Sequence, residues 1–383
     1  MAADPSNIPL SLYVHLPWCE RKCPYCDFNS HENFDVGDED TYVAALLRDL
    51  EQQESRILGR KPASIFIGGG TPSLFSGPSI ARLLEGINRV WGIDKGTEIT
   101  LEANPGSAEV ARFKAYRDAG VSRVSIGVQS FDNQHLARLG RIHQSDQAKA
   151  AIAAATSIFS DWNIDLMHGL PEQTVEQAIA DIATAIAFGG THISWYQLTI
   201  ERNTRFWSNP PLLPEEDELT TIQETGASLL GDSGFAQYEV SAWAREGRLS
   251  QHNMNYWEFG DYLGIGAGAH GKLTTEDGQI IRTQRTRLPK DYLSGILSNM
   301  PTIDQAIPPQ DLAAEFMMNA LRLRGGVDVS IFSRRTGQSQ ASLEPARTVL
   351  QKRGLLTDAG ARLQTTQLGY RFLNSVSAEF LAL

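Results

Sequence analysis

The stretch Leu12–Asn29, LYVHLPWCERKCPYCDFN, decides the fold because it contains all three cysteines of the chain. Cys19, Cys23 and Cys26 have the spacing C-x3-C-x2-C and follow directly after an apolar, strand-like run. Three thiolates in one loop can converge on one soft metal centre. Because a four-iron cluster has four iron corners, three protein thiolates leave one iron open to an outside ligand. The stretch therefore predicts a [4Fe-4S] site with one exchangeable corner.

Two other uses of the cysteines are less favoured. His15 or His31 could complete a Cys3His zinc site, but zinc ligands come more often as two separated pairs. A disulfide would leave one thiol over. The N-terminus, MAADPSNIPL, also lacks the basic and apolar regions of a signal peptide that would point to an oxidising compartment.

The composition is that of an ordinary globular protein, with 42% hydrophobic and 21% charged residues in a chain of 383. No apolar run approaches the ~18–20 residues of a membrane span. The net charge of −11 argues against broad nucleic-acid binding. We expect a cytoplasmic protein with one large domain and one smaller domain.

Six short apolar patterns alternate with helical patterns in the first 200 residues, which predicts a parallel sheet with right-handed crossovers. The strands are expected near residues 11–16, 63–67, 98–102, 123–128, 163–167 and 192–199. One helical stretch is expected over 133–159, and Thr174 and Gln177 are placed as a capping box at the start of the helix after the fifth strand. Polar side chains stand at or just past the ends of all six strands, where both barrels and open α/β sheets place their sites. Their spread over every strand favours a partial (β/α)6 barrel over a doubly wound sheet.

The alternation stops near residue 205. A proline-containing linker and a helix at about 215–230 come next, followed by HNMNYW (252–257) and LGIGAGAHG (263–271). From residue 304 onward the pattern is helical and similar to a winged helix. We predict three regions: a barrel with the cluster site (1–205), a linker helix and barrel extension (206–300), and a helical C-terminal domain (301–383). Because the chain is acidic, we expect the C-terminal domain to act as a packing module rather than to bind nucleic acid.

The cysteine motif resembles that of the radical S-adenosylmethionine (SAM) superfamily, in which the methionine amino and carboxylate groups bind the open iron. Together with Tyr13, His15, Pro17 and Pro24-Tyr25, it looks like the coproporphyrinogen oxidase group of that superfamily, and the resemblance covers residues 10–380. It implies SAM as a second cofactor. The SAM-binding residues that it implies are Tyr13, Tyr25, Gly69, Gly70, Thr71, Glu102, Gln129, Arg141, Asp165 and Thr199. Glycines in such a loop let the backbone approach a ligand where a Cβ would clash.

The chain departs from the oxidase pattern at two places. Phe28 stands where the oxidases have a fourth cysteine, and only 18 residues precede Cys19, so the longer N-terminal extension is missing. With HNMNYW, these departures resemble the oxidase-like heme chaperones of the group. Taken alone, HNMNYW is most simply a packed turn with a hydrogen-bonded histidine. The resemblance implies a heme site, with His252 as axial ligand and Tyr256 and Trp257 packed on the porphyrin. His270 is a second candidate ligand, although a structural role is favoured for it.

These observations predict a heme chaperone that contains a [4Fe-4S] cluster and SAM, passes heme to acceptor proteins, and needs no catalytic residue. Membrane-bound acceptors, a position at the inner face of the membrane and a homodimer are compatible with this prediction, and no nucleic-acid partner is expected. The enzyme alternative is an oxygen-independent coproporphyrinogen III oxidase, which decarboxylates propionate side chains. A cluster-sensing winged-helix regulator is a third, less favoured class.

Overall fold

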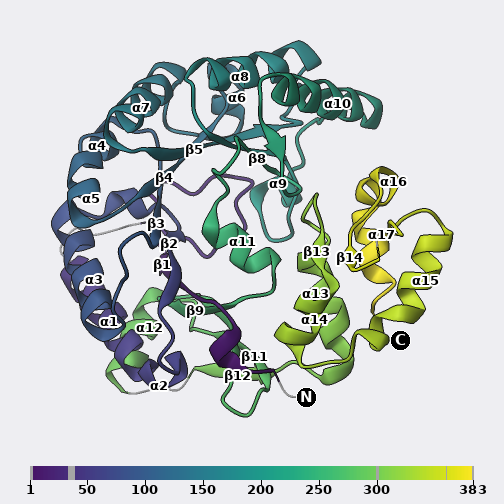
Figure 1. Cartoon of the computed structure of the whole chain (residues 1–383). Coiled ribbons are helices and arrows are strands. Elements are labelled where there is room, and N and C mark those ends of the chain that lie inside the picture. The colour runs from purple at the N-terminus through teal and green to yellow at the C-terminus, as the bar shows by residue number, and fades with distance from the viewer. Residues whose placement is uncertain (1–2, 33–38, 299–301, 359, 382–383) are drawn as a thin grey trace.

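One long mixed sheet organises the molecule. The computed structural model describes residues 3–32, 39–298, 302–358 and 360–381. Six parallel strands lie side by side in chain order at its centre, as predicted. They are β1 (Leu10–Leu16), β2 (Pro62–Gly69), β3 (Glu98–Ala103), β4 (Arg123–Gln129), β5 (Asp161–His168) and β6 (His192–Gln197). The strands curve around a central space, which confirms the partial (β/α)6 barrel (Figure 1).

Helices cover the outer, convex side of this sheet (Figure 1). They are α1 (Glu39–Gln52), α2 (Glu54–Ile57), α3 (Gly77–Val90), α4 (Ser107–Val110), α5 (Phe113–Ala119), α6 (Asn133–Arg138), α7 (Ser145–Ile158), α8 (Val175–Ala187) and α10 (Glu216–Asp232). Helix α9 (Arg205–Ser208) lies instead beside the loop that carries the cysteines, where the Phe206 N–H donates to the Pro24 carbonyl (3.0 Å). Local sequence fixes their ends. In α8, for example, Thr174 and Gln177 form the reciprocal capping box that the sequence predicts.

The helical pattern after Asp132 forms two helices rather than one. Helix α6 ends before Gly140, whose φ of +69° is a left-handed conformation that favours glycine. A second capping box, between Gln144 and Gln147, then begins α7. The short connection between the two helices contains Arg141, which is thereby directed back toward the end of the sheet.

The sheet extends beyond the six predicted strands at both ends. Strand β9 (Asp261–Ile265) pairs in parallel with β1, and β10 (His270–Thr274), β11 (Ile280–Gln284) and β12 (Ile303–Ala306) continue from it as antiparallel neighbours. At the other end β8 (Ala242–Ala244) and β7 (Ala236–Gln237) follow β6. Strand β12 was not predicted, because the pattern from residue 304 onward is helical and this strand has only four residues, all of them exposed.

Helix α11 (Gln251–Trp257), which carries HNMNYW, lies inside the curve of the sheet rather than outside it (Figure 1). Its His252 ring stacks on Phe66 of β2 with centroids 4.2 Å apart. Ser250 caps the helix by accepting the N–H of Asn253. A short helix in this position divides the interior of the barrel into two parts.

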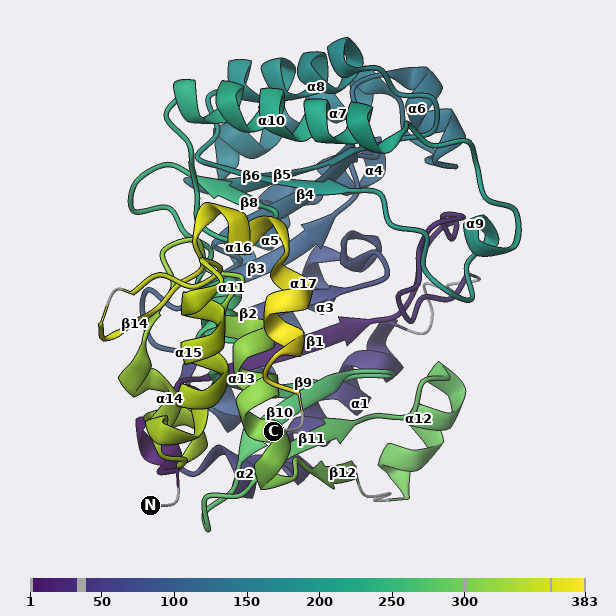
Figure 2. The ribbon, with the colours of Figure 1, turned by 90° about the vertical axis from the view of Figure 1, so that its right-hand side faces the viewer.

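The C-terminal domain packs across the open side of the barrel (Figure 2). Its elements are α13 (Leu312–Ala320), β13 (Val327–Asp328), α14 (Val329–Thr336), α15 (Glu344–Lys352), β14 (Arg362–Leu363), α16 (Gln367–Arg371) and α17 (Leu373–Ala378), and α12 (Pro289–Leu297) precedes them on the barrel side. The two short strands pair as a small wing. Phe316 and Phe332 centre its core, which continues through Phe259 into the barrel. Among the described residues, no helix is long and apolar enough to cross a bilayer.

Candidate functional site

The loop after β1 places all three cysteines on one cavity of about 450 Å³, which we call the cysteine cavity. Its other walls include Tyr25, Thr71, Glu102, Gln129, Arg141, Asp165 and His252. The loop is held at its ends, since the Cys19 N–H donates to the His31 carbonyl (2.9 Å) and the His31 N–H donates to that of Pro17 (2.7 Å). Burial raises the pKa of the Cys19 and Cys26 thiols, so bound metal would be needed to keep both as thiolates.

The three cysteines on one cavity are the donor set that a [4Fe-4S] cluster with one open iron uses. In the described part of the chain, no three Cys, His, Asp or Glu side chains are close enough to share one ion. Thiolates of a cubane bind separate irons and therefore stand further apart. Both nitrogens of His15 are also occupied, by the Tyr13 hydroxyl (2.7 Å) and the Asn29 carbonyl (2.8 Å). This geometry gives no support to a zinc site completed by His15.

Arg141 provides the positive charge beside the cysteines. Its Nη2 donates to Asn104 Oδ1 (2.7 Å) and to the Gly127 carbonyl (2.8 Å), and its Nη1 lies 3.6 Å from Cys23 Sγ. Two fixed acceptors hold the guanidinium in one orientation. An anionic cluster or a ligand carboxylate at this position would therefore meet an already oriented cation.

Two carboxylates, one from β3 and one from β5, face the same cavity. Glu102 accepts the Gly69 N–H at one oxygen (3.1 Å), and its other oxygen has no hydrogen-bond partner among the described residues. Burial, with a contribution from Asp165, raises the pKa of Glu102 to about 7. Asp165 accepts from Ser125 (2.9 Å) and Asn163 (2.6 Å). A carboxylate with a free oxygen at a cavity wall can accept hydroxyl groups of a ligand.

The glycine loop shapes the cavity from behind. A Cβ on Gly70 would lie 2.4 Å from the Trp18 carbonyl oxygen, and one on Gly69 would lie 2.9 Å from the His15 ring. Gly69 also has φ +121°, a conformation that L side chains rarely adopt. These glycines thus let β2 and the cysteine loop pack closely, while Thr71 reaches the cavity itself.

Gln129 has a strained backbone at its place on the cavity wall. It follows a register shift at the end of β4 and has φ +68°. Its Oε1 accepts the Tyr196 hydroxyl at 2.8 Å. Non-glycine residues in this region cluster at functional sites, where surrounding structure offsets the strain.

Eight of the ten residues implied for SAM gather in this region, six on the cavity wall and the two glycines behind it. Thr199 is exposed and does not line the cysteine cavity, and Tyr13 faces a different space. The sequence reasoning missed several wall residues, namely Asn104, Ser125, Asn163, Ser194 and Tyr196. Most stand two positions from a predicted residue or from each other, so the alternation of a strand could have indicated them.

The second space, which we call the aromatic cavity, has a volume of about 680 Å³. Its walls include Tyr13, Phe66, Tyr256, Trp257, Tyr262, His270, Arg282 and Arg287. The structure therefore separates the predicted heme residues. Tyr256 and Trp257 face the aromatic cavity, whereas His252 faces the cysteine cavity on the other side of α11.

His252 is buried and well bonded. Its Nδ1 lies 2.9 Å from the Ser250 hydroxyl and 3.3 Å from Glu98, and its ring stacks on Phe66. Burial lowers the pKa of His252, against the influence of Glu98. These contacts fix α11 against β2 and β3.

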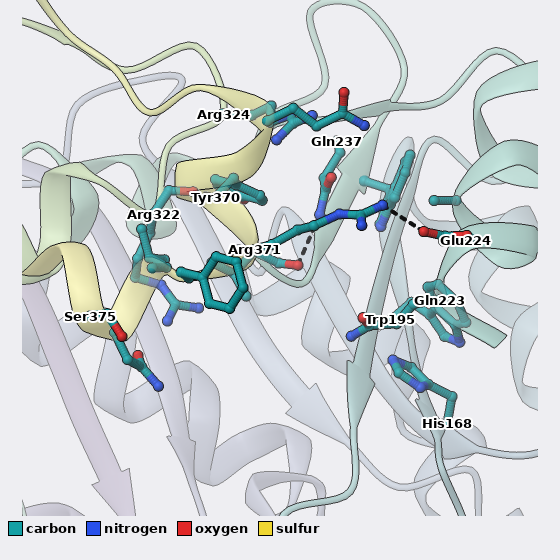
Figure 3. Close-up of a pocket in the computed structure, with 17 residues that line it drawn as sticks. His168, Trp195, Gln223, Glu224, Gln237, Arg322, Arg324, Tyr370, Arg371 and Ser375 are labelled. Carbon is teal, nitrogen blue, oxygen red and sulfur yellow. Dashed lines mark hydrogen bonds and ion pairs between the residues drawn. The ribbon is translucent and has the colours of Figure 1, made fainter. Parts of the chain in front are cut away.

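A third cavity, of about 610 Å³, lies where the C-terminal domain meets α10 and the strands β5, β6 and β8 (Figure 3). Arg371 of α16 reaches across it to Glu224 of α10 at 2.5 Å. The guanidinium of Arg322 is paired with Glu239 (3.0 Å) and lies 4.3 Å from the centre of the Trp257 ring. This space is bridged by ion pairs between the domain and the barrel.

The geometry agrees with comparisons to known proteins. The radical SAM superfamily model matches residues 13–185, and the HemN C-terminal domain model matches residues 307–372. The chain is 47% identical to the heme chaperone HemW of Escherichia coli (strain K12), over 98% of both chains, and 47% identical to that of Haemophilus influenzae, over 98% of this chain and 99% of the relative. The structure of coproporphyrinogen III oxidase (HemN) from Escherichia coli superposes with a TM-score of 0.82 at 22% identity, covering 97% of this chain and 90% of that one, and so shares the fold. The chain thus belongs to the HemW family of the radical SAM superfamily.

Proposed function

We propose that this protein is a heme chaperone, which binds heme and transfers it to acceptor proteins in the cytoplasm, membrane-bound acceptors included. The observation that carries the proposal is 47% identity, over nearly the whole chain, to proteins named heme chaperone HemW. The similarity covers 98% of both chains, so it includes α11 and the C-terminal domain as well as the barrel. A homodimer stays a prediction, to be checked by sedimentation with and without heme.

The cysteine cavity is the proposed site of the cluster and of SAM. Cys19, Cys23 and Cys26 would hold three irons, and SAM would occupy the fourth. When bound, this pair of cofactors supplies one-electron and radical chemistry.

Individual side chains have distinct proposed roles toward SAM. Glu102 would accept ribose hydroxyls at its free oxygen, because the other oxygen is held by Gly69. Arg141 would orient negative charge beside Cys23. The other residues that we propose to bind SAM at the cavity wall are Tyr25, Thr71, Gln129 and Asp165, with Gly69 and Gly70 behind this wall. Tyr13 and Thr199 complete the proposed set. Because they lie outside this wall, they have the least support from the geometry.

Heme is proposed to bind beside α11, whose residues His252, Tyr256 and Trp257 form a partition inside the barrel. Tyr256 and Trp257 offer aromatic surface to the aromatic cavity. Phe28 supports a chaperone rather than an oxidase. It replaces the fourth cysteine of the oxidase pattern and is 64% exposed, at a point that touches both cavities.

One experiment separates the chaperone from the oxidase. Anaerobically reconstituted protein would be titrated with heme and, in parallel, incubated with coproporphyrinogen III, SAM and a reductant. We expect about one heme per chain and no decarboxylation. Cys23→Ala serves as the matched variant, and it should retain heme while losing the cluster, because the two sites use different residues. Multiple-turnover conversion of coproporphyrinogen III would establish the oxidase function instead.

A further inference from the structure

The iron ligand of the heme site can be inferred from the aromatic cavity, provided that the chain binds heme as proposed above. Phe66, His252 and Tyr256 stand in a row between the two cavities, with ring centroids 4.2 Å and 6.3 Å apart. This row is a packed wall. A planar ligand that lies in the aromatic cavity, against Tyr256, therefore cannot also contact the His252 imidazole unless this wall is displaced.

The aromatic cavity suits a large, flat and mostly apolar ligand. Its volume of about 680 Å³ lies within the ~300–1,000 Å³ range of pockets that enclose ligands of drug size. Tyr256 and Tyr262 pack edge to face at 4.7 Å, and Trp257 lies next to them on the wall.

His270 is the histidine of this cavity whose ring nitrogens are free. It lies at the start of β10, is exposed to the cavity, and makes no side-chain hydrogen bond within the described residues. The other histidine on the wall, His15, has both nitrogens bonded, to Tyr13 and to Asn29. A neutral imidazole with an open lone pair is the axial ligand found in many heme proteins.

The charges around the cavity complement carboxylates. Arg287 is exposed on its wall and has no ion pair among the described residues. Lys272 (2.9 Å) and Arg60 (2.7 Å) both form ion pairs with Asp261. Because two cations share one carboxylate, these three buried side chains carry one net positive charge. Arg282 is paired with the Glu315 carboxylate and also donates to the Tyr262 hydroxyl, and Asp27 is the acidic residue on the wall. The free guanidinium of Arg287 is thus the natural partner for a propionate.

We propose that heme binds in the aromatic cavity, with His270 as axial ligand of the iron and Arg287 paired to a propionate. In this arrangement His252 is a positioning residue, which fixes α11 through Glu98 and Ser250. The porphyrin would lie against Tyr256 and Trp257. One porphyrin edge would lie near Phe28, which lines the mouths of both cavities.

The test compares two histidine variants of the full-length, reconstituted protein. Heme is titrated into each, and the Soret band and the low-temperature electron paramagnetic resonance spectrum are recorded. His270→Ala should lose the imidazole-ligated spectrum and bind heme at least about tenfold more weakly, the equivalent of about 1.4 kcal/mol. Added free imidazole should restore the spectrum. His252→Ala should keep the imidazole-ligated spectrum, although its affinity can fall as the wall loosens.

A second pair of measurements tests the propionate contact. Arg287→Gln should weaken the binding of heme several-fold but leave the binding of heme dimethyl ester, which has no free carboxylate, as in the wild type. If His252→Ala loses the imidazole spectrum and His270→Ala keeps it, this assignment is wrong while the chaperone function stands. If the wild-type protein binds no stoichiometric heme, the proposed function itself fails.

Discussion

Replacing Glu102 with Gln should stabilise the cofactor-free protein above neutral pH. Burial raises the pKa of this carboxyl group from 4.5 to about 7. Below pH 4.5 the group is protonated in both the folded and the unfolded chain and has no effect. Between pH 4.5 and 7 only the unfolded chain ionises it, so stability falls as pH rises. Each pH unit is worth about 1.4 kcal/mol, which makes the full loss about 3 kcal/mol above pH 7.

The measurement is denaturant unfolding of the cluster-free protein at pH 5, 6, 7 and 8. The difference in unfolding free energy between Glu102→Gln and the wild type should grow with pH, to about 3 kcal/mol in favour of the variant. Glu85→Gln, which changes an exposed carboxylate on α3, is the control and should show no such slope. A constant difference across the range would refute the reasoning, because it would mean that Glu102 does not titrate in this window.

The same carboxylate should be needed for SAM. Glu102→Ala should weaken SAM binding to the reconstituted protein by about 1–3 kcal/mol, the scale of a lost hydrogen bond to a charged group. If Glu102→Gln, the stabilising variant, also binds SAM less well than the wild type, the Glu102 carboxylate lowers stability but contributes to cofactor binding. Equal affinities, measured by equilibrium dialysis, would remove Glu102 from the site.

Three further predictions concern the cluster. Cys23→Ala should abolish the loading of about four irons and four sulfides per chain, as measured by iron and sulfide assays, and a stoichiometric zinc content with no iron would contradict the cluster assignment. Gly70→Val should impair both iron loading and SAM binding, because its Cβ would meet the Trp18 carbonyl at 2.4 Å, whereas Gly231→Ala, with nothing within 4 Å, should be tolerated. Arg141→Gln should lower the reduction potential in a redox titration, since a positive charge 3.6 Å from Cys23 Sγ favours the reduced cluster; an unchanged potential would exclude that role.

Local sequence was sufficient for several features. The apolar run before Cys19 predicted β1, and the alternation of apolar patterns predicted the parallel strands, because periodicity records which face of each element is buried. Thr174 and Gln177 predicted the start of α8, since a capping box is completed within four residues. The strand-end positions of Glu102 and Asp165 predicted that both face one cavity, because parallel strands present their carboxyl ends at the same edge.

Other features depend on contacts between distant parts of the chain. The stacking of His252 on Phe66 joins residues 186 positions apart, and its bond to Glu98 spans 154 positions. No local pattern records such contacts. HNMNYW looked like one ligand set, because His252 and Tyr256 are four positions apart and so lie on one face of a helix. In the structure the two rings form part of a wall, 6.3 Å apart, and line different cavities.

The sequence by itself therefore determined the cysteine loop, the order of the barrel strands and the residues at their ends, all of which follow from spacing and periodicity. The tertiary structure alone decided that β9–β12 extend the sheet, that α11 lies inside it, and that His270 and Arg287 meet Tyr256 across a second cavity. The physical reason is that these residues come together only when β9 pairs with β1 and brings β10–β12 with it. That step depends on the burial of apolar surface between segments about 250 residues apart.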